Sequence, residues 1–150
     1  MRGLILAFAF ALLPWSVQGG PVKILPVKLL DTSHEAKDQA PDHVRRLDLL
    51  ADVLAEELPG ILLGREAVAQ ACPRETTDCL MALLRQDGAE RGLFIVVQKS
   101  STLILQIFAS LVEVESGRLI THEELNFRGD NDESWRRAGQ FLARQLRDAD

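Results

Sequence analysis

An acidic run near the end of the chain, Asp130-Asn131-Asp132-Glu133, holds residue types that could bind a cation or act as acid and base. An EF-hand calcium loop needs ligands at alternating positions over about twelve residues, with a glycine and a distal glutamate, and this run lacks that pattern. Acidic residues are also favoured where a helix begins. We interpret the run as a helix cap, with Asp130 as N-cap and Glu133 completing a capping box. A partner-binding surface, or a metal or catalytic site, is the alternative.

A second polar segment, Gln98-Lys99-Ser100-Ser101-Thr102, follows an apolar run and could supply a serine nucleophile with a lysine base. Neighbouring side chains on a strand point to opposite faces, so Lys99 and Ser100 cannot readily pair, whereas Lys99 and Ser101 share a face. We expect a hydrogen-bonded turn here. Contact with a ligand or partner is the alternative, because α/β proteins often bind ligands where a buried strand ends.

The remaining residues give no sign of a catalytic or metal site. The three histidines, His34, His43 and His122, have no ligand spacing, and each is predicted to lie at the surface. The chain has no glycine-rich phosphate loop, no G-x-S-x-G sequence and no zinc signature. We therefore predict no catalytic residue, no metal and no cofactor, and we expect the protein not to be an enzyme.

Two cysteines, Cys72 and Cys79, lie close together in the sequence. In an exported protein the default interpretation is a disulfide, which would stabilise the fold by roughly 2–3 kcal/mol in the chain-entropy model. Their spacing is neither C-x-x-C nor that of a zinc knuckle, and no histidine is nearby. Free thiols, a redox pair or two metal ligands are the alternatives.

Residues 1–19 have the features of a signal peptide. Arg2 is followed by an apolar run from Leu4 to Leu13, which is too short to span a bilayer, and Pro14 ends that run. Small residues then precede a cleavage position near Gly19. A buried amino-terminal helix is the alternative. We predict export to the periplasm, with residues 20–150 as a single α/β domain and no transmembrane segment in the mature chain.

The composition excludes one class of partner. Without Arg2, 16 basic residues stand against 22 acidic residues, and the chain has no tyrosine and few other aromatic residues. Phosphate backbones require basic patches, and single-stranded bases require aromatic side chains to stack on. Nucleic acid is therefore excluded as a partner.

Hydrophobic periodicity predicts the elements that must position these residues. Amphipathic helices are expected over residues 41–58 and 79–86 (capped by Thr77 or Asp78). A final helix is expected after its N-cap at Asp130, with its apolar residues between Trp135 and Leu146. Strands are expected over residues 21–30 (near an edge, or with a bulge at Pro26), 93–97, 103–114 and 119–127, with a hairpin turn at 115–118. Residues 61–70 could form a short strand or a weak helix. The order β-α-(β)-α-β-β-β-α predicts an α/β (α+β) fold, with a mixed sheet of four to five strands and about three helices.

Two segments carry a resemblance to a known family. Residues 97–105, VQKSSTLIL, and residues 128–135, RGDNDESW, resemble V-Q-K-x-S-N-L-I-L and R-G-N-x-D-E-S-W in a family of small exported bacterial proteins catalogued only as a domain of unknown function. Thr102 replaces the first asparagine of that pattern, and Asp130 replaces the second. The resemblance implies an accessory role in periplasmic alcohol oxidation. The strand order is also similar to that of the amino-terminal domain of TolB, a fold used for protein contacts.

These observations predict a non-enzymatic periplasmic accessory or interaction protein with an unidentified periplasmic protein partner. A periplasmic module that binds a small ligand is the alternative. The predicted partner or ligand surface combines both polar segments and consists of Gln98, Lys99, Ser101, Arg128, Asp130, Asp132 and Glu133.

Overall fold

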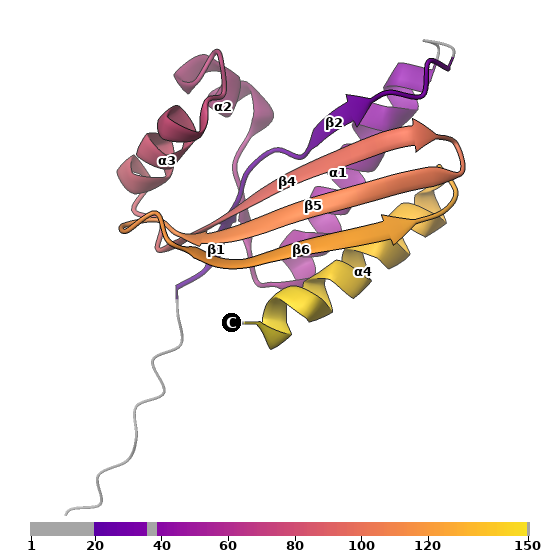
Figure 1. The fold of residues 1–150 in the computed structure, drawn as a ribbon. Helices are drawn as coiled ribbons and strands as arrows, with labels where there is room; N and C mark the ends of the chain where they lie inside the picture. Colours follow the sequence, from indigo (N-terminus) through magenta and orange to yellow (C-terminus); the bar gives the residue numbers. More distant parts are fainter. Residues whose placement is uncertain (1–19, 36–38, 150) are drawn as a thin grey trace, which may run out of the picture.

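The structure is a computed structural model that describes residues 20–35 and 39–149. The predicted signal peptide, residues 1–19, lies outside this range. The described residues form six strands and four helices (Figure 1). In chain order these are β1 (Val22–Ile24), β2 (Lys28–Asp31), α1 (Ala40–Glu57), β3 (Ile61–Leu62), α2 (Arg65–Ala71), α3 (Thr77–Gln86), β4 (Arg91–Ser101), β5 (Ile104–Glu113), β6 (Leu119–Phe127) and α4 (Asp132–Asp148).

The six strands form one mixed sheet, which confirms the predicted fold class with one strand and one helix more than expected. The sheet order is β3-β1-β4-β5-β6, and β2 pairs separately with β4. β1 and β2 run parallel to β4, whereas β4, β5 and β6 form an antiparallel meander. The ambiguous segment 61–70 contains both predicted possibilities, because β3 is followed directly by α2.

Proline divides the predicted first strand in two. A proline has no N–H to give to a sheet ladder, and Pro26 accordingly lies between β1 and β2. Both pieces pair with β4, and β1 lies between β3 and β4 rather than at an edge of the sheet.

The helices cover the two faces of the sheet unequally. α1 and α4 lie side by side on one face, which we call the inner face (Figure 1). Alternate residues of β4 and β5 pack there against the apolar stripes of both helices. On the outer face a smaller core forms only near the start of β4, where α2 and α3 pack through Val68, Leu80 and Leu84. Much of the outer face is left without a helix.

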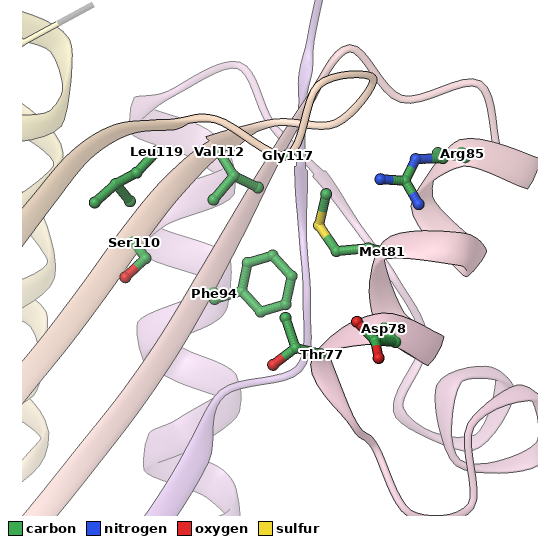
Figure 2. Close-up of a pocket in the computed structure, with 9 residues that line it drawn as sticks. All are labelled: Thr77, Asp78, Met81, Arg85, Phe94, Ser110, Val112, Gly117 and Leu119. Carbon is green, nitrogen blue, oxygen red and sulfur yellow. The ribbon is translucent and has the colours of Figure 1, made fainter.

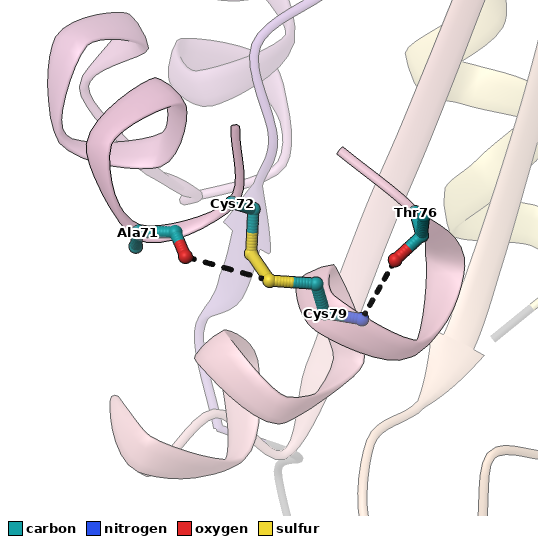
Figure 3. Close-up of a disulfide and its surroundings, with 4 residues drawn as sticks. All are labelled: Ala71, Cys72, Thr76 and Cys79. Carbon is teal, nitrogen blue, oxygen red and sulfur yellow. Dashed lines mark hydrogen bonds between the residues drawn. A yellow bond between two sulfur atoms is a disulfide. The ribbon is translucent and has the colours of Figure 1, made fainter. Parts of the chain in front are cut away.

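The predicted disulfide is confirmed: Cys72 and Cys79 are bonded, with their Cα atoms 5.8 Å apart (Figure 3). The bond joins the end of α2 to the first turn of α3. The helix α3 begins at Thr77, two residues before the predicted start, so the predicted cap at Thr77 or Asp78 is wrong. Thr76 is the N-cap, and its hydroxyl accepts a hydrogen bond from the backbone N–H of Cys79.

None of the helices in the described ranges is long and apolar enough to cross a membrane.

Candidate functional site

Lys99 is buried on the inner face of the sheet, and its side chain has no exposed surface. Leu93, Ile95 and Val97 precede it on the same face and belong to the main core, so strand alternation places Lys99 at the end of an apolar row. The prediction of a turn over residues 98–102 is wrong, because β4 continues to Ser101.

The ammonium group of Lys99 has three oxygen atoms within 3 Å. Its Nζ lies 2.8 Å from Oδ2 of Asp130, 2.9 Å from Oε2 of Glu35 and 2.7 Å from Oε1 of Gln39. A lysine ammonium has three N–H donors and no acceptor. Two carboxylates and one amide oxygen therefore surround the buried ammonium group.

Asp130 uses both carboxylate oxygens, and its side chain is only 2% exposed. Oδ1 accepts hydrogen bonds from Nη1 of Arg46 and Nε1 of Trp135, each at 2.9 Å. Oδ2 faces Nζ of Lys99 and lies 3.1 Å from Nε2 of His43. Asp130 therefore joins three separate parts of the fold: α1 through Arg46 and His43, β4 through Lys99 and α4 through Trp135.

The prediction that His43 lies at the surface is wrong: it is 7% exposed, on the inner side of α1. Its Nε2 lies 3.0 Å from Nζ of Lys99 and 3.1 Å from Oδ2 of Asp130. Because the carboxylate of Asp130 can only accept, we assign the imidazole proton to Nε2, which then donates to Asp130 Oδ2.

We call these residues the Lys99–Asp130 network; its members are Glu35, Gln39, His43, Arg46, Lys99, Asp130 and Trp135. Asp132 extends it towards the surface: Arg46 Nε donates to Asp132 Oδ1 at 3.1 Å, and Arg45 contacts the other oxygen. The two arginines of α1 thereby hold the segment from which α4 begins.

The expected capping box is wrong, and the network explains why. The N-cap of α4 is Asn131, whose Oδ1 accepts from the backbone N–H of Ser134. The carboxylate of Asp130 instead points into the protein, where Arg46, Trp135 and Lys99 contact it. Glu133 is exposed and pairs with Arg136 and Arg137 on its own helix.

The pKa values follow from this arrangement. Burial alone would lower the pKa of Lys99, but hydrogen bonds to Asp130 and Glu35 outweigh burial and raise it. Burial alone would raise the pKa of Asp130, but hydrogen bonds from Lys99, Trp135 and His43 outweigh burial and lower it. The hydrogen bond from Lys99 likewise lowers the pKa of Glu35. Both Lys99 and Asp130 therefore carry their charges at neutral pH.

Acid is expected to weaken the fold through Asp130. A carboxylate with a lowered pKa contributes stability that is complete above its ordinary pKa of about 4 and is lost as the pH falls through the lowered value. Lys99 has the opposite sign, since its contribution is complete below about pH 10.4 and is lost only in stronger base. We expect the urea midpoint of the wild type to fall more steeply below about pH 5 than that of Asp130→Ala. If the urea midpoint fell equally steeply with pH in both proteins, Asp130 would not be the source of the acid sensitivity.

Next to the network, the β4–β5 hairpin ends in two exposed aliphatic side chains. Leu103 is 68% exposed and Ile104 is 55% exposed. The backbone beside them is held: Thr102 donates its N–H to Oε1 of Glu35 at 2.8 Å and accepts from the N–H of Asp130 at 2.8 Å. We call Leu103 and Ile104 the hairpin tip.

The structure brings together only some of the predicted site residues. Lys99 and Asp130 are in contact, and Asp132 is linked to Asp130 through Arg46. The side chains of Lys99 and Asp130 are buried, however, and not on the surface as predicted. Gln98 lies on the outer face of the sheet, where it pairs with Gln106. The other predicted residues, Ser101, Arg128 and Glu133, lie partly or fully exposed around the hairpin tip and the start of α4.

Sequence reasoning missed five members of the network, Glu35, Gln39, His43, Arg46 and Trp135. One signal for His43 was available, since it precedes Leu47 by four residues and so lies on the apolar face of α1. Glu35 and Gln39 lie in a polar segment that carries no pattern of its own.

Ser110 and His122 form a second polar pair, on the outer face. Ser110 Oγ lies 2.8 Å from His122 Nδ1, and His122 Nε2 lies 3.6 Å from Glu124. This resembles a nucleophile with its base. However, β5 pairs with strands on both sides, so ladder hydrogen bonds take up the backbone N–H groups that an oxyanion hole would need. We assign no catalysis to the pair. Across residues 20–35 and 39–149, no cluster of His, Cys, Asp and Glu is arranged to hold a metal ion.

Comparison of sequences identifies one family. The sequence model of the DUF3280 family, which is described as "Protein of unknown function (DUF2380)", matches residues 21–146. Both segments on which the resemblance rests lie within this range. A search of curated proteins found no match to the chain.

Comparison of structures finds similar folds in proteins of low sequence identity. PelC from Paraburkholderia phytofirmans, solved as a dodecamer, has a TM-score of 0.54 at 11% identity, over 83% of this chain and 85% of PelC. Lipoprotein GNA1162 from Neisseria meningitidis has a TM-score of 0.52 at 14% identity, over 85% of this chain and 94% of GNA1162. TolB from Acinetobacter baumannii has a TM-score of 0.52 at 14% identity, over 88% of this chain and 28% of TolB. The expected similarity to TolB is confirmed for the fold, which is all that such identities show.

Proposed function

We propose that this chain, which belongs to the DUF3280 family of proteins of unknown function, is a non-enzymatic exported protein that acts by binding another protein. The contact surface in this proposal is the hairpin tip with three partly or fully exposed residues beside it, Ser101, Arg128 and Glu133. The observation that carries the proposal is the exposure of Leu103 and Ile104 side by side at the end of a hairpin.

Two features make the hairpin tip a suitable contact surface. Large aliphatic side chains that stand together in water favour burial against a partner. The backbone behind the tip is also fixed, because Thr102 donates its N–H to Glu35 and accepts from the N–H of Asp130. A rigid surface loses less conformational entropy on binding than a mobile one.

The Lys99–Asp130 network supports the proposal through its position. Replacing a buried ion pair by apolar residues is often neutral or stabilising, so such a pair is weak evidence for stability alone. Here the pair joins β4, α1 and the start of α4 immediately behind the hairpin tip. We infer that its role is to fix the relative position of the tip and the segment 128–133.

Export to the periplasm is the second part of the proposal. It rests on the signal-peptide features of residues 1–19 and is supported by the disulfide between Cys72 and Cys79, since disulfides persist in oxidising compartments. The finer proposal, that the partner takes part in periplasmic alcohol oxidation, rests on the family resemblance alone.

Affinity capture from periplasmic extract tests the contact surface. The mature chain is compared with Leu103→Ser/Ile104→Ser, which removes the apolar tip, and with Arg128→Ala/Asp132→Ala, which alters the charges beside it. The matched control is Val44→Ser/Phe141→Ser, because these two side chains are 51% and 43% exposed on α1 and α4.

We expect a partner that the wild type and the control retain and that the tip variant loses. Because the tip is exposed, its replacement should leave the free energy of unfolding within about 0.5 kcal/mol of the wild-type value. Capture that is the same for all four proteins would reject the tip as the contact surface. An alcohol-oxidising enzyme as the captured protein would support the finer proposal, and any other identity would reject it.

A further inference from the structure

A pocket of about 760 Å³ lies between α3 and the outer face of the sheet (Figure 2). It is near the start of β4, so it stands at the opposite end of that strand from the hairpin tip. The side chains of Phe94 and Met81 point into it, with Val112 and Leu119 beside them. Its volume lies within the range of small-molecule sites, which are lined mostly by apolar groups with a few polar ones.

Opposite charges stand at the two ends of the pocket. Asp78 lies in the first turn of α3 and Arg85 lies in its last turn, and both line the pocket. Seven residues of α-helix separate them by about 10 Å along the axis. Arg85 donates its Nε to the carbonyl of Val114 at 3.1 Å, which anchors the guanidinium at the pocket's edge. Among the described residues neither charge has an ion-pair partner.

The wall that carries these charges is fixed at both ends. At its start, the disulfide and the Thr76 cap hold the first turn of α3 (Figure 3). At its other end, Leu84 packs directly on Gly92 of β4: a Cβ on that glycine would lie 2.6 Å from Leu84 Cδ1. The pocket is therefore preformed, which lowers the entropy cost of binding.

We infer that this pocket binds a short peptide with free termini, in an extended conformation along α3. The peptide's ammonium group faces Asp78, its carboxylate faces Arg85, and an apolar side chain lies over Phe94 and Met81. An extended tripeptide spans about 10 Å, which matches the separation of the two charges. This inference is independent of the proposed contact surface, which uses other residues.

Calorimetric titration of the mature chain with trileucine tests the site. Four probes are compared: free trileucine, its N-acetyl form, its C-terminal amide and the form blocked at both ends. We expect free trileucine to bind at millimolar concentration or below. Each blocked terminus should weaken binding about two- to fivefold, as for partly exposed ion pairs.

Two variants assign the charges. In Asp78→Asn, acetylation should no longer weaken binding, whereas amidation still does; in Arg85→Gln the pattern should reverse. The helix dipole also favours an acid in the first turn and a base in the last, so both variants are expected to change the stability of α3 whether or not the peptide binds. The variants are therefore compared by the ratio of the dissociation constants of blocked and free trileucine. Arg74→Gln, in the exposed loop before α3, is the matched control and should keep both ratios. No binding of trileucine, equal binding of the free and doubly blocked forms, or ratios unchanged in both variants would overturn the inference.

Discussion

Replacing Lys99 by methionine is expected to lower the free energy of unfolding by about 3–5 kcal/mol. Methionine fills similar space but leaves Asp130, Glu35 and Gln39 without the ammonium group that now lies within 3 Å of each. A buried carboxylate that loses one of its charged partners accounts for most of the loss. Urea denaturation at pH 7 measures the change, with the slope of the transition checking that unfolding remains two-state.

Lys28→Met is the matched control. Lys28 also pairs with a carboxylate, Glu75, but its side chain is 42% exposed. An exposed pair of this kind contributes about 0–1 kcal/mol. If Lys99→Met were no more destabilising than Lys28→Met, the Lys99–Asp130 network would not hold the fold together as described.

In a second variant, replacing Trp135 by alanine is expected to lower the free energy of unfolding by about 3–5 kcal/mol, as for other large-to-small changes in a core. Trp135 is fully buried where α4 meets the sheet, and its ring meets Phe127 edge-on with 5.6 Å between centroids. Its indole N–H also donates to Asp130. The substitution therefore removes apolar packing and one donor of the network together.

Trp135→Phe separates these two contributions. Phenylalanine keeps an aromatic ring against Phe127 but cannot donate to Asp130, and the loss of one such hydrogen bond costs about 1–3 kcal/mol. We expect Trp135→Phe to lie between the wild type and Trp135→Ala in urea denaturation. An alanine variant no less stable than the phenylalanine variant would contradict the assigned packing role.

The sequence predicted the elements whose pattern is long and regular. α1 and α4 have apolar residues at helical spacing, so the sequence predicted both helices. It also predicted the three strands of the meander β4 to β6, with the turn at 115–118. The short pieces were not resolved, because β3 has two residues and its neighbour α2 has seven. Their structure depends on pairing with β1 and on the disulfide, neither of which a local pattern shows.

The candidate site was predicted only in part. Lys99 and Asp130 were both selected, but as surface residues. Their meeting depends on the pairing of β4, β5 and β6, which brings the end of β4 beside the start of α4, and this is a tertiary effect. The same effect overrode local capping, because buried donors hold Asp130 and leave Asn131 as the cap.

One departure from the family pattern also has a physical explanation. Asp130 stands where the pattern has asparagine, and in this chain it accepts from four donors, two of them cationic. An amide offers one acceptor oxygen, whereas a carboxylate offers two and a negative charge. The aspartate therefore suits the buried ammonium of Lys99.

Site-specific photo-crosslinking in the periplasm tests whether the hairpin tip contacts another protein. A photoreactive amino acid is placed at Leu103 on the hairpin tip or, as control, at Phe141 on α4, both exposed in the structure. We expect a discrete crosslinked protein from position 103 that is absent from position 141. Crosslinking from position 141 alone would contradict the assignment of the hairpin tip as the contact surface, as would no crosslink from position 103.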